Sequence, residues 1–143
     1  MRLFPGLSVL TLGVGNVARA TAFYERLGWR VSKAASTRAQ TVFELNNLLL
    51  RIAPSDAVAR DLAAPERRPM TTYAQHYGDP ASVARALETA QSAGAEILAH
   101  GGDARAAFAD PDGHVWELVY DSRMIPAADG TVRPSGARDR GQA

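Results

Sequence analysis

The most informative absence in this sequence is cysteine. The chain of 143 residues has none, and it has only three histidines. Without cysteine it can form no disulfide, no thiol nucleophile, no iron–sulfur cluster and no cysteine-ligated zinc site. Any metal site must therefore combine carboxylates with His76, His100 or His114.

Long apolar runs are missing as well. No stretch approaches the roughly 18 consecutive apolar residues of a membrane span. Residues 1–15 lack the charged start, apolar middle and small-residue cleavage site of a secretory signal. We therefore expect a cytoplasmic protein that has no membrane partner.

A strong charge of either sign is also absent. Sixteen Lys and Arg side chains stand against fifteen Asp and Glu, which gives a formal net charge of +1. Residues 122–143 hold four arginines and two aspartates, so they contribute +2 and the rest of the chain sums to −1. We therefore expect no basic face for nucleic acid on the folded part.

The first third of the chain shows a regular pattern of elements. Residues 8–14 are apolar and β-branched, which predicts a strand. Asn16 is placed to cap a helix whose apolar positions recur at helical spacing up to residue 27, and Gly28 is placed to end it. Three further strands are predicted at residues 29–32, 41–45 and 48–53.

The same pattern begins again 63 residues later, counted between the predicted helix caps Asn16 and Asp79. A strand at residues 71–77 precedes Asp79, Pro80 suits the first helical turn, and Gly94 ends the helix. Strands are predicted at residues 96–99, 106–109 and 114–120, with a turn at 110–113 before the last of them. The sequence thus predicts an α+β fold of two tandem β-α-β-β-β modules.

Composition sets the expected domain boundaries. We predict one domain over residues 1–123, with module one at 7–54, a polar linker with one or two helical turns at 55–69, and module two at 70–121. Residues 124–143 are rich in Gly, Pro, Arg and Ala without periodicity. We expect them to be a mostly disordered tail with residues 124–126 packed, the alternative being an arm that lies over a partner subunit.

Two motifs show a resemblance to a known family. TLGVGNVARATAFYERLGW at residues 11–29 and FADPDGHVWELVY at residues 108–120, within the duplicated pattern, resemble the vicinal-oxygen-chelate superfamily. That superfamily includes glyoxalase I-like lyases, extradiol dioxygenases, epimerases, and fosfomycin and bleomycin resistance proteins. The resemblance covers residues 7–121 and implies two curved sheets that enclose a cleft, but it specifies the fold more closely than the function.

The resemblance also locates the family's metal ligands, which come from the first and last strands of each module. Glu117 keeps the acid of the last strand of module two. The other three positions fall on Val9, Thr72 and Arg51, or on Leu50 in place of Arg51 if the turn differs by one residue. One acid, one hydroxyl, one aliphatic group and one cation do not form a divalent-metal site. We therefore expect that the inherited metal site is lost and that no cofactor is bound.

The expected ligand-binding residues line the cleft. Arg51 and Glu117 either form a structural ion pair between the modules, or Arg51 grips an anionic or carbonyl group while Glu117 acts as base or acceptor. His76 shares a strand face with Thr72, and it is either a ligand contact or a histidine at the rim. The predicted lining consists of Thr11, Phe43, Arg51, Thr72, His76 and Glu117.

One motif points to a different ligand. Residues 13–18 match the dinucleotide fingerprint G-x-G-x-x-A between a strand and a helix. No acid stands at the end of the next strand, where Lys33 and Arg38 lie, and the elements that follow are consecutive strands. We therefore expect no dinucleotide at this segment.

Three hypotheses for the function follow. The first is a homodimeric small-molecule-binding protein, similar to the bleomycin resistance branch, which sequesters its ligand or performs chemistry without a metal. The second is a lyase, isomerase or dioxygenase that uses Glu117 together with a metal held by unexpected ligands such as His76. The third is a degenerate partner domain whose cleft is filled by the pair of Arg51 and Glu117. The sequence does not name the ligand.

Overall fold

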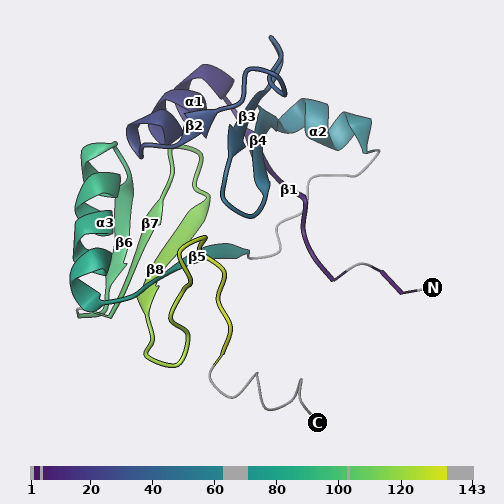
Figure 1. Ribbon diagram of the computed structural model, residues 1–143. Helices are drawn as coiled ribbons and strands as arrows, with labels where there is room; N and C mark the ends of the chain where they lie inside the picture. Colours follow the sequence, from purple (N-terminus) through teal and green to yellow (C-terminus); the bar gives the residue numbers. More distant parts are fainter. Residues whose placement is uncertain (1, 4, 63–70, 103, 135–143) are drawn as a thin grey trace. The chain divides into compact units, whose positions relative to one another are not determined.

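The computed structural model describes residues 2–3, 5–62, 71–102 and 104–134. It contains two compact units, Met1–Pro69 (unit 1) and Met70–Ala143 (unit 2). Each unit holds a four-stranded sheet with a helix packed against it (Figure 1). The predicted α+β fold of two tandem β-α-β-β-β modules is confirmed.

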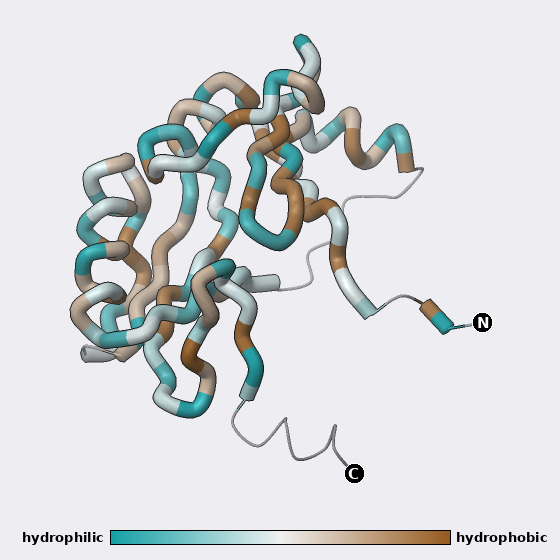
Figure 2. The backbone as a smooth tube through the Cα atoms, viewed as in Figure 1, coloured by the Kyte–Doolittle hydropathy of each residue, from teal (hydrophilic) through white to brown (hydrophobic). Residues whose placement is uncertain are grey.

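Unit 1 builds its sheet from strands that are close in sequence. Its elements are β1 (Val9–Val14), α1 (Val17–Arg26), β2 (Arg30–Val31), β3 (Thr41–Glu44), β4 (Leu49–Pro54) and α2 (Ser55–Asp61). The strand order is β1-β4-β3-β2, with β1 parallel to β4 and the other neighbours antiparallel. The β3–β4 hairpin is mostly apolar along β4, with Arg51 as the exception, and polar at the Asn46-Asn47 turn (Figure 2).

A cluster of aromatic rings fills the space between α1 and the sheet of unit 1. Tyr24 is fully buried, stacks on Trp29 with 5.3 Å between ring centroids, and meets Phe43 edge-on at 5.9 Å. Thr21 of α1 donates a hydrogen bond from its hydroxyl to that of Thr41 on β3 at 2.8 Å. The face of the sheet toward α1 is therefore the core of unit 1.

Unit 2 repeats this topology. Its elements are β5 (Thr72–Tyr77), α3 (Pro80–Ser92), β6 (Glu96–His100), β7 (Arg105–Ala109) and β8 (Val115–Tyr120). The strand order is β5-β8-β7-β6, again with the first strand parallel to the last and the other neighbours antiparallel. The two units therefore place equivalent residues at equivalent positions in their sheets.

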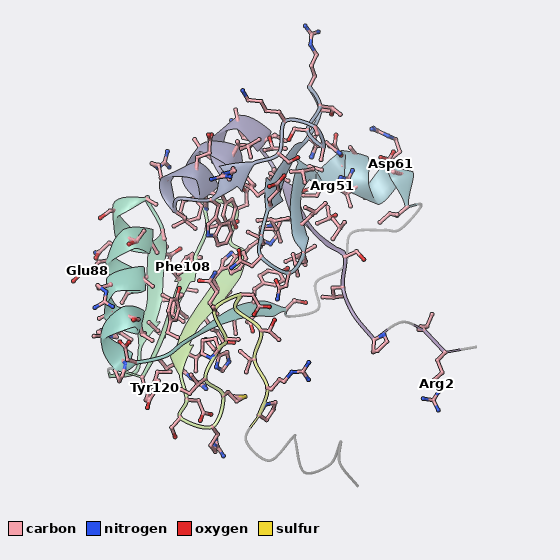
Figure 3. All side chains as sticks on the ribbon, in the orientation of Figure 1. Arg2, Arg51, Asp61, Glu88, Phe108 and Tyr120 are labelled. Atoms are coloured by element: carbon pink, nitrogen blue, oxygen red, sulfur yellow. The ribbon has the colours of Figure 1, made fainter. Side chains whose placement is uncertain are left out.

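The core of unit 2 lies between its sheet and α3. Phe108, Trp116 and Leu118 are at most 4% exposed. Phe108 lies between the sheet and α3, whereas Glu88 points outward from α3 (Figure 3). Apolar and polar segments alternate along α3, as expected for a helix with one buried side (Figure 2).

Both long helices begin and end where the sequence predicts. Asn16 Oδ1 accepts a hydrogen bond from a backbone N–H in the first turn of α1 at 2.9 Å, and Asp79 Oδ1 accepts the corresponding bond in α3 at 2.7 Å. These bonds satisfy N–H groups that no helical carbonyl reaches. Gly28 and Gly94 follow the helix ends with φ values of 97° and 102°, a conformation that glycine adopts without strain.

The aspartate cap makes the stability of unit 2 sensitive to acid. Hydrogen bonds from the backbone N–H and the hydroxyl of Ser82 lower the pKa of Asp79 below its ordinary value of 3.8. Because the folded pKa lies below the unfolded one, this contribution is fully present above pH 3.8 and is lost as the pH falls through the folded value.

We therefore expect Asp79→Asn to lose less stability than the wild type when the pH falls from about 5 to about 2, as measured by urea unfolding. The matched control is Asn16→Asp, which places the same acid at the uncharged cap of α1 and should add acid sensitivity. Equal pH profiles for Asp79→Asn and the wild type would contradict this account of the cap.

Asp110 builds the turn that precedes β8. Its buried carboxylate accepts, through Oδ1, the backbone N–H groups of Asp112 and His114, both at 2.9 Å. The backbone carbonyl of Asp110 accepts the N–H of Gly113 at 3.0 Å, and Gly113 has a φ of 92°. The predicted turn at residues 110–113 is confirmed, and it sets the start of the strand that carries Glu117.

The described part of the tail contains more structure than the sequence suggests, whereas the described part of the linker is as expected. Residues 55–61 of the predicted linker form α2, a helix of seven residues, which agrees with the one or two helical turns that the sequence predicts. In the tail, Pro126 and Val132 form a β-bridge around a turn that includes Gly130. Residues 63–69 and 135–143 lie outside the described residues, so disorder of the chain end stays a prediction.

Within the described ranges, no helix has the length and apolar character needed to cross a membrane.

Candidate functional site

Each sheet has one face against its long helix and one face turned away from it, which we call the distal face. Successive residues of a strand point to opposite faces, and residues paired across neighbouring strands share a face. In unit 1 these rules place Thr11, Arg51 and Val42 in one row of the distal face, across β1, β4 and β3. Two of the predicted site residues are therefore brought side by side.

An equivalent row crosses the distal face of unit 2. Thr11 and Ala74 each stand five residues before the cap of the following helix. Thr11 pairs with Arg51, and Ala74 pairs with Glu117. Arg51 is therefore the counterpart of Glu117, whereas the other candidate, Leu50, is fully buried on the face toward α1. The register resolves an ambiguity of one residue that the sequence left open.

Arg51 is held by a neutral side chain. Its Nε donates a hydrogen bond to Oε1 of Gln40 at 2.6 Å. The arginine is partly buried and belongs to β4 (Figure 3). The sequence does not predict Gln40 as a site residue; once the register places Val42 on the distal face, the spacing of two residues between Gln40 and Val42 agrees with a position on the same side of the sheet.

Glu117 is held by Thr72 within unit 2. Thr72 Oγ1 donates a hydrogen bond to Glu117 Oε2 at 2.9 Å. Ala74 and Ala107 flank Glu117 on the two neighbouring strands, so the carboxylate stands beside methyl groups on both sides. The structure thus brings two predicted residues together, while the predicted pairing of Glu117 with Arg51 stays a prediction.

His76 lies on the same face, one row along from Glu117. It shares its row with Val119 and Arg105. Its Nδ1 is buried and has no hydrogen-bond partner among the described residues. The pKa of Asp121 is lowered chiefly by hydrogen bonds from Arg123 and, as a smaller cause, by the charge of His76. A polar cluster therefore continues beyond Glu117 toward the end of β8.

Phe43 does not belong to this face. The sequence predicts it as a wall of the cleft, but its side chain is fully buried and packs against Tyr24 of α1. It pairs with Leu50, so it points to the side opposite Arg51 and Val42. The prediction is corrected: Phe43 is a core residue of unit 1.

The positions that the resemblance assigns to metal ligands do not fit a divalent ion. Val9 has no donor atom, Arg51 is a cation that repels other cations, and the hydroxyl of Thr72 already donates to Glu117. Glu117 alone is a suitable ligand. Among the residues that the structure describes, no group of three or more His, Asp and Glu is arranged to hold a metal ion.

The glycine-rich segment at residues 13–18 has a structural explanation. A Cβ on Gly13 would lie 3.0 Å from Oγ and 3.3 Å from Cα of Ser55, the first residue of α2. Gly13 therefore permits the close approach of α2 to β1. Asn16 caps α1 with its side chain, and antiparallel strands follow the helix. These roles account for Gly13 and Asn16 within the segment that matches the dinucleotide fingerprint.

The chain matches one protein family over most of its length. The family model described as the Glyoxalase/Bleomycin resistance protein/Dioxygenase superfamily matches residues 6–118. A comparison with curated proteins found no match.

Solved structures show the same fold. A glyoxalase-related enzyme from Fulvimarina pelagi is 26% identical with a TM-score of 0.79, over 91% of this chain and 98% of that one. A glyoxalase/bleomycin resistance protein/dioxygenase from Nocardioides is 19% identical with a TM-score of 0.68, over 84% and 85% of the two chains.

A third similar structure contains a metal. It is a variant of the fosfomycin resistance protein FosX from Listeria monocytogenes, in complex with Mn(II) and 1S,2S-dihydroxypropylphosphonic acid. It is 21% identical with a TM-score of 0.62, over 82% of this chain and 90% of that one.

Proposed function

Since this chain belongs to the Glyoxalase/Bleomycin resistance protein/Dioxygenase superfamily, we propose that it binds a small organic molecule without the help of a metal ion. The observation that supports this proposal is how the two charged residues at the family's metal positions are held. Arg51 is hydrogen-bonded to Gln40 and Glu117 to Thr72, so neutral neighbours in the same unit orient both side chains. A bound ion is not needed to organise either of them.

The two distal faces offer different chemistry to a ligand. Arg51 in unit 1 can only donate hydrogen bonds, whereas an ionised Glu117 in unit 2 can only accept them. Thr72 occupies one oxygen of that carboxylate, which leaves the other for a donor on a ligand. Sequestration needs no more than such contacts. Metal-free chemistry would use Glu117 to accept a proton, with the imidazole of His76 one row along on the same face.

Metal independence predicts a clear thermal result. Addition of Mn²⁺, Ni²⁺, Fe²⁺ or Zn²⁺ at about 1 mM to chelator-treated protein should leave the Tm unchanged, since an ion raises it only by binding the folded state. Elemental analysis of the purified protein should find less than one divalent metal ion per chain. Stoichiometric metal, or a rise of several degrees that Glu117→Ala abolishes, would overturn the proposal.

The alternative is a metal-dependent lyase, isomerase or dioxygenase that uses Glu117. It is favoured by the position of His76 one row from Glu117, and by the Mn(II) in the FosX relative. In that case both His76→Ala and Glu117→Gln should abolish a metal-induced rise in Tm. Thr11→Val in unit 1 serves as the matched control and should leave the rise intact.

We also propose that the protein is a homodimer, as related proteins usually pair. Sedimentation velocity at two protein concentrations measures the mass directly. A monomer mass at both concentrations would contradict this assembly.

A further inference from the structure

We infer that Arg51 and Gln40 form a subsite for an oxyanion group of the ligand, either a carboxylate or a phosphoryl group. The inference rests on the proposed function, because it names the chemical class of the molecule that the protein binds. It is supported by the place of Arg51 in the sheet, by the bond that orients its guanidinium, and by the neutral side chains around it.

Arg51 occupies an interior position of the sheet rather than an edge. It lies on β4, with Thr11 on one neighbouring strand and Val42 on the other. The arginine is partly buried, and Val42 beside it is only 5% exposed. A charge in such surroundings is less screened by water, so it attracts an opposite charge more strongly than a fully solvated arginine does.

The bond to Gln40 orients the guanidinium without neutralising it. Nε donates to an amide oxygen, which has no formal charge, whereas a carboxylate partner would have compensated the cation. The guanidinium is a planar fork with five N–H donors, and Gln40 engages the one on Nε. In the described part of the chain, Gln40 is the hydrogen-bond partner that the structure gives to Arg51.

This arrangement leaves the two terminal nitrogens, Nη1 and Nη2, at the end of a plane that is already fixed. A group with two coplanar oxygens binds to that end through two parallel hydrogen bonds. Because the side chain is oriented before the ligand arrives, less rotamer entropy is lost on binding. Gln40 is therefore a positioning residue for Arg51.

The neighbouring side chains favour an anion over a cation. Thr11 supplies a hydroxyl in the same row, which can donate a further hydrogen bond to an oxyanion. Among the strand residues of unit 1, the one acid on the distal face is Glu44, which lies in the next row and directly opposite Arg30. The row of Arg51 itself is neutral apart from the guanidinium.

The test is a titration followed by ¹H–¹⁵N correlation spectra that include the arginine Nε–H signals. The probes are sodium acetate and inorganic phosphate, each added at constant ionic strength to metal-free protein. We expect saturable shifts at the Arg51 Nε–H and at the backbone amides of Thr11, Val42 and Arg51, with dissociation constants on the order of 1–10 mM for such small probes. The probe that binds more tightly identifies the carboxylate or the phosphoryl group as the chemistry of the ligand.

Variants of Arg51 and Gln40 distinguish the contribution of the arginine's charge to anion binding from the contribution of its orientation. Arg51→Gln should abolish the saturable shifts, and Arg51→Lys should weaken binding by about tenfold because a lysine has no fork and no Nε–H for Gln40 to hold. Gln40→Met keeps the charge and removes the tether, so we expect binding weaker by about threefold. Arg30→Gln, on the same face at the edge strand, is the matched control and should bind within about twofold of the wild type.

Three results would overturn the inference. The first is the absence of saturable shifts with either probe up to about 100 mM. The second is a shift pattern centred on other arginines that survives in Arg51→Gln. The third is an unchanged affinity in Gln40→Met, which would show that Gln40 does not position Arg51. Because the titration uses metal-free protein and reports on Arg51, its failure is distinct from a failure of metal independence, which appears at Glu117 in the metal titration.

Discussion

Replacing Phe43 with alanine is expected to lower the free energy of unfolding by about 3–5 kcal/mol. Phe43 is fully buried and meets the ring of Tyr24 edge-on, with 5.9 Å between centroids. The substitution removes the apolar burial of the ring and its aromatic contact. It also leaves a cavity, since the hydrogen bond between Thr21 and Thr41 joins α1 to β3 next to the gap and limits how far the helix can close it.

Urea unfolding followed by circular dichroism measures this loss. The matched control is Val9→Ala, an apolar truncation on the distal face of the same sheet at a residue that is 48% exposed. We expect the control to change the free energy of unfolding by no more than about 0.5 kcal/mol. If Phe43→Ala cost less than about 1 kcal/mol, the ring would not be a core residue, and its predicted place in the cleft would be restored.

The case of Phe43 shows where sequence reasoning loses information about the site. Adjacent residues of a strand point to opposite faces of the sheet. An error of one residue in the register therefore assigns core residues to the binding face and binding residues to the core. The sequence predicts the strand that became β3 but does not state whether Val42 or Phe43 lies beside Arg51. The hairpin fixes Val42 opposite Arg51, and the aromatic residue therefore packs against α1.

Other parts of the fold could be predicted because their causes are local. The caps Asn16 and Asp79, and the glycines Gly28 and Gly94, act through hydrogen bonds and backbone angles within a few residues of themselves. The repeat of that local pattern predicts two modules of the same topology.

The partners of the charged residues could not be predicted in the same way. Gln40 reaches Arg51 across 11 positions of the sequence, and Thr72 reaches Glu117 across 45. These contacts depend on strand pairing, which the composition of a single strand does not determine. The sequence therefore predicts Arg51, Thr72 and Glu117 as residues of the candidate site, while Gln40 and the hydrogen bonds that hold the two charged groups emerge only from the structure.

The same register predicts that a single substitution, Ala74→His, will create a metal site on the distal face of unit 2. Ala74 pairs directly with Glu117, and His76 lies two residues further along β5 on the same face. Neighbouring strands are about 4.8 Å apart and alternate residues of a strand about 6.6 Å apart, so two imidazoles and one carboxylate can converge on one ion. Because Nδ1 of His76 is buried, Nε2 is the nitrogen that would bind.

We expect Zn²⁺ to raise the Tm of Ala74→His markedly and to leave the wild type unchanged. At a free concentration one hundred times the dissociation constant, a ligand stabilises the folded state by about 2.7 kcal/mol. For a chain of this size that corresponds to a rise in Tm on the order of 8 °C. Differential scanning fluorimetry with and without Zn²⁺ measures the effect.

The double variant Ala74→His with Glu117→Gln is the matched control, because it keeps both imidazoles and removes the carboxylate. Its response to Zn²⁺ should fall to a small fraction of that of the single variant, since an amide oxygen is a much weaker zinc ligand than a carboxylate. An equal response of the two variants would show that Glu117 does not face residue 74, and the assignment of Glu117 to the distal face would fail. A large response in the wild type would show that the native ligand set already suffices, which contradicts metal independence. A rise in Tm confined to the single variant would show that the distal face of unit 2 can hold a metal ion. The wild type would then fail to bind metal because that face has one imidazole too few.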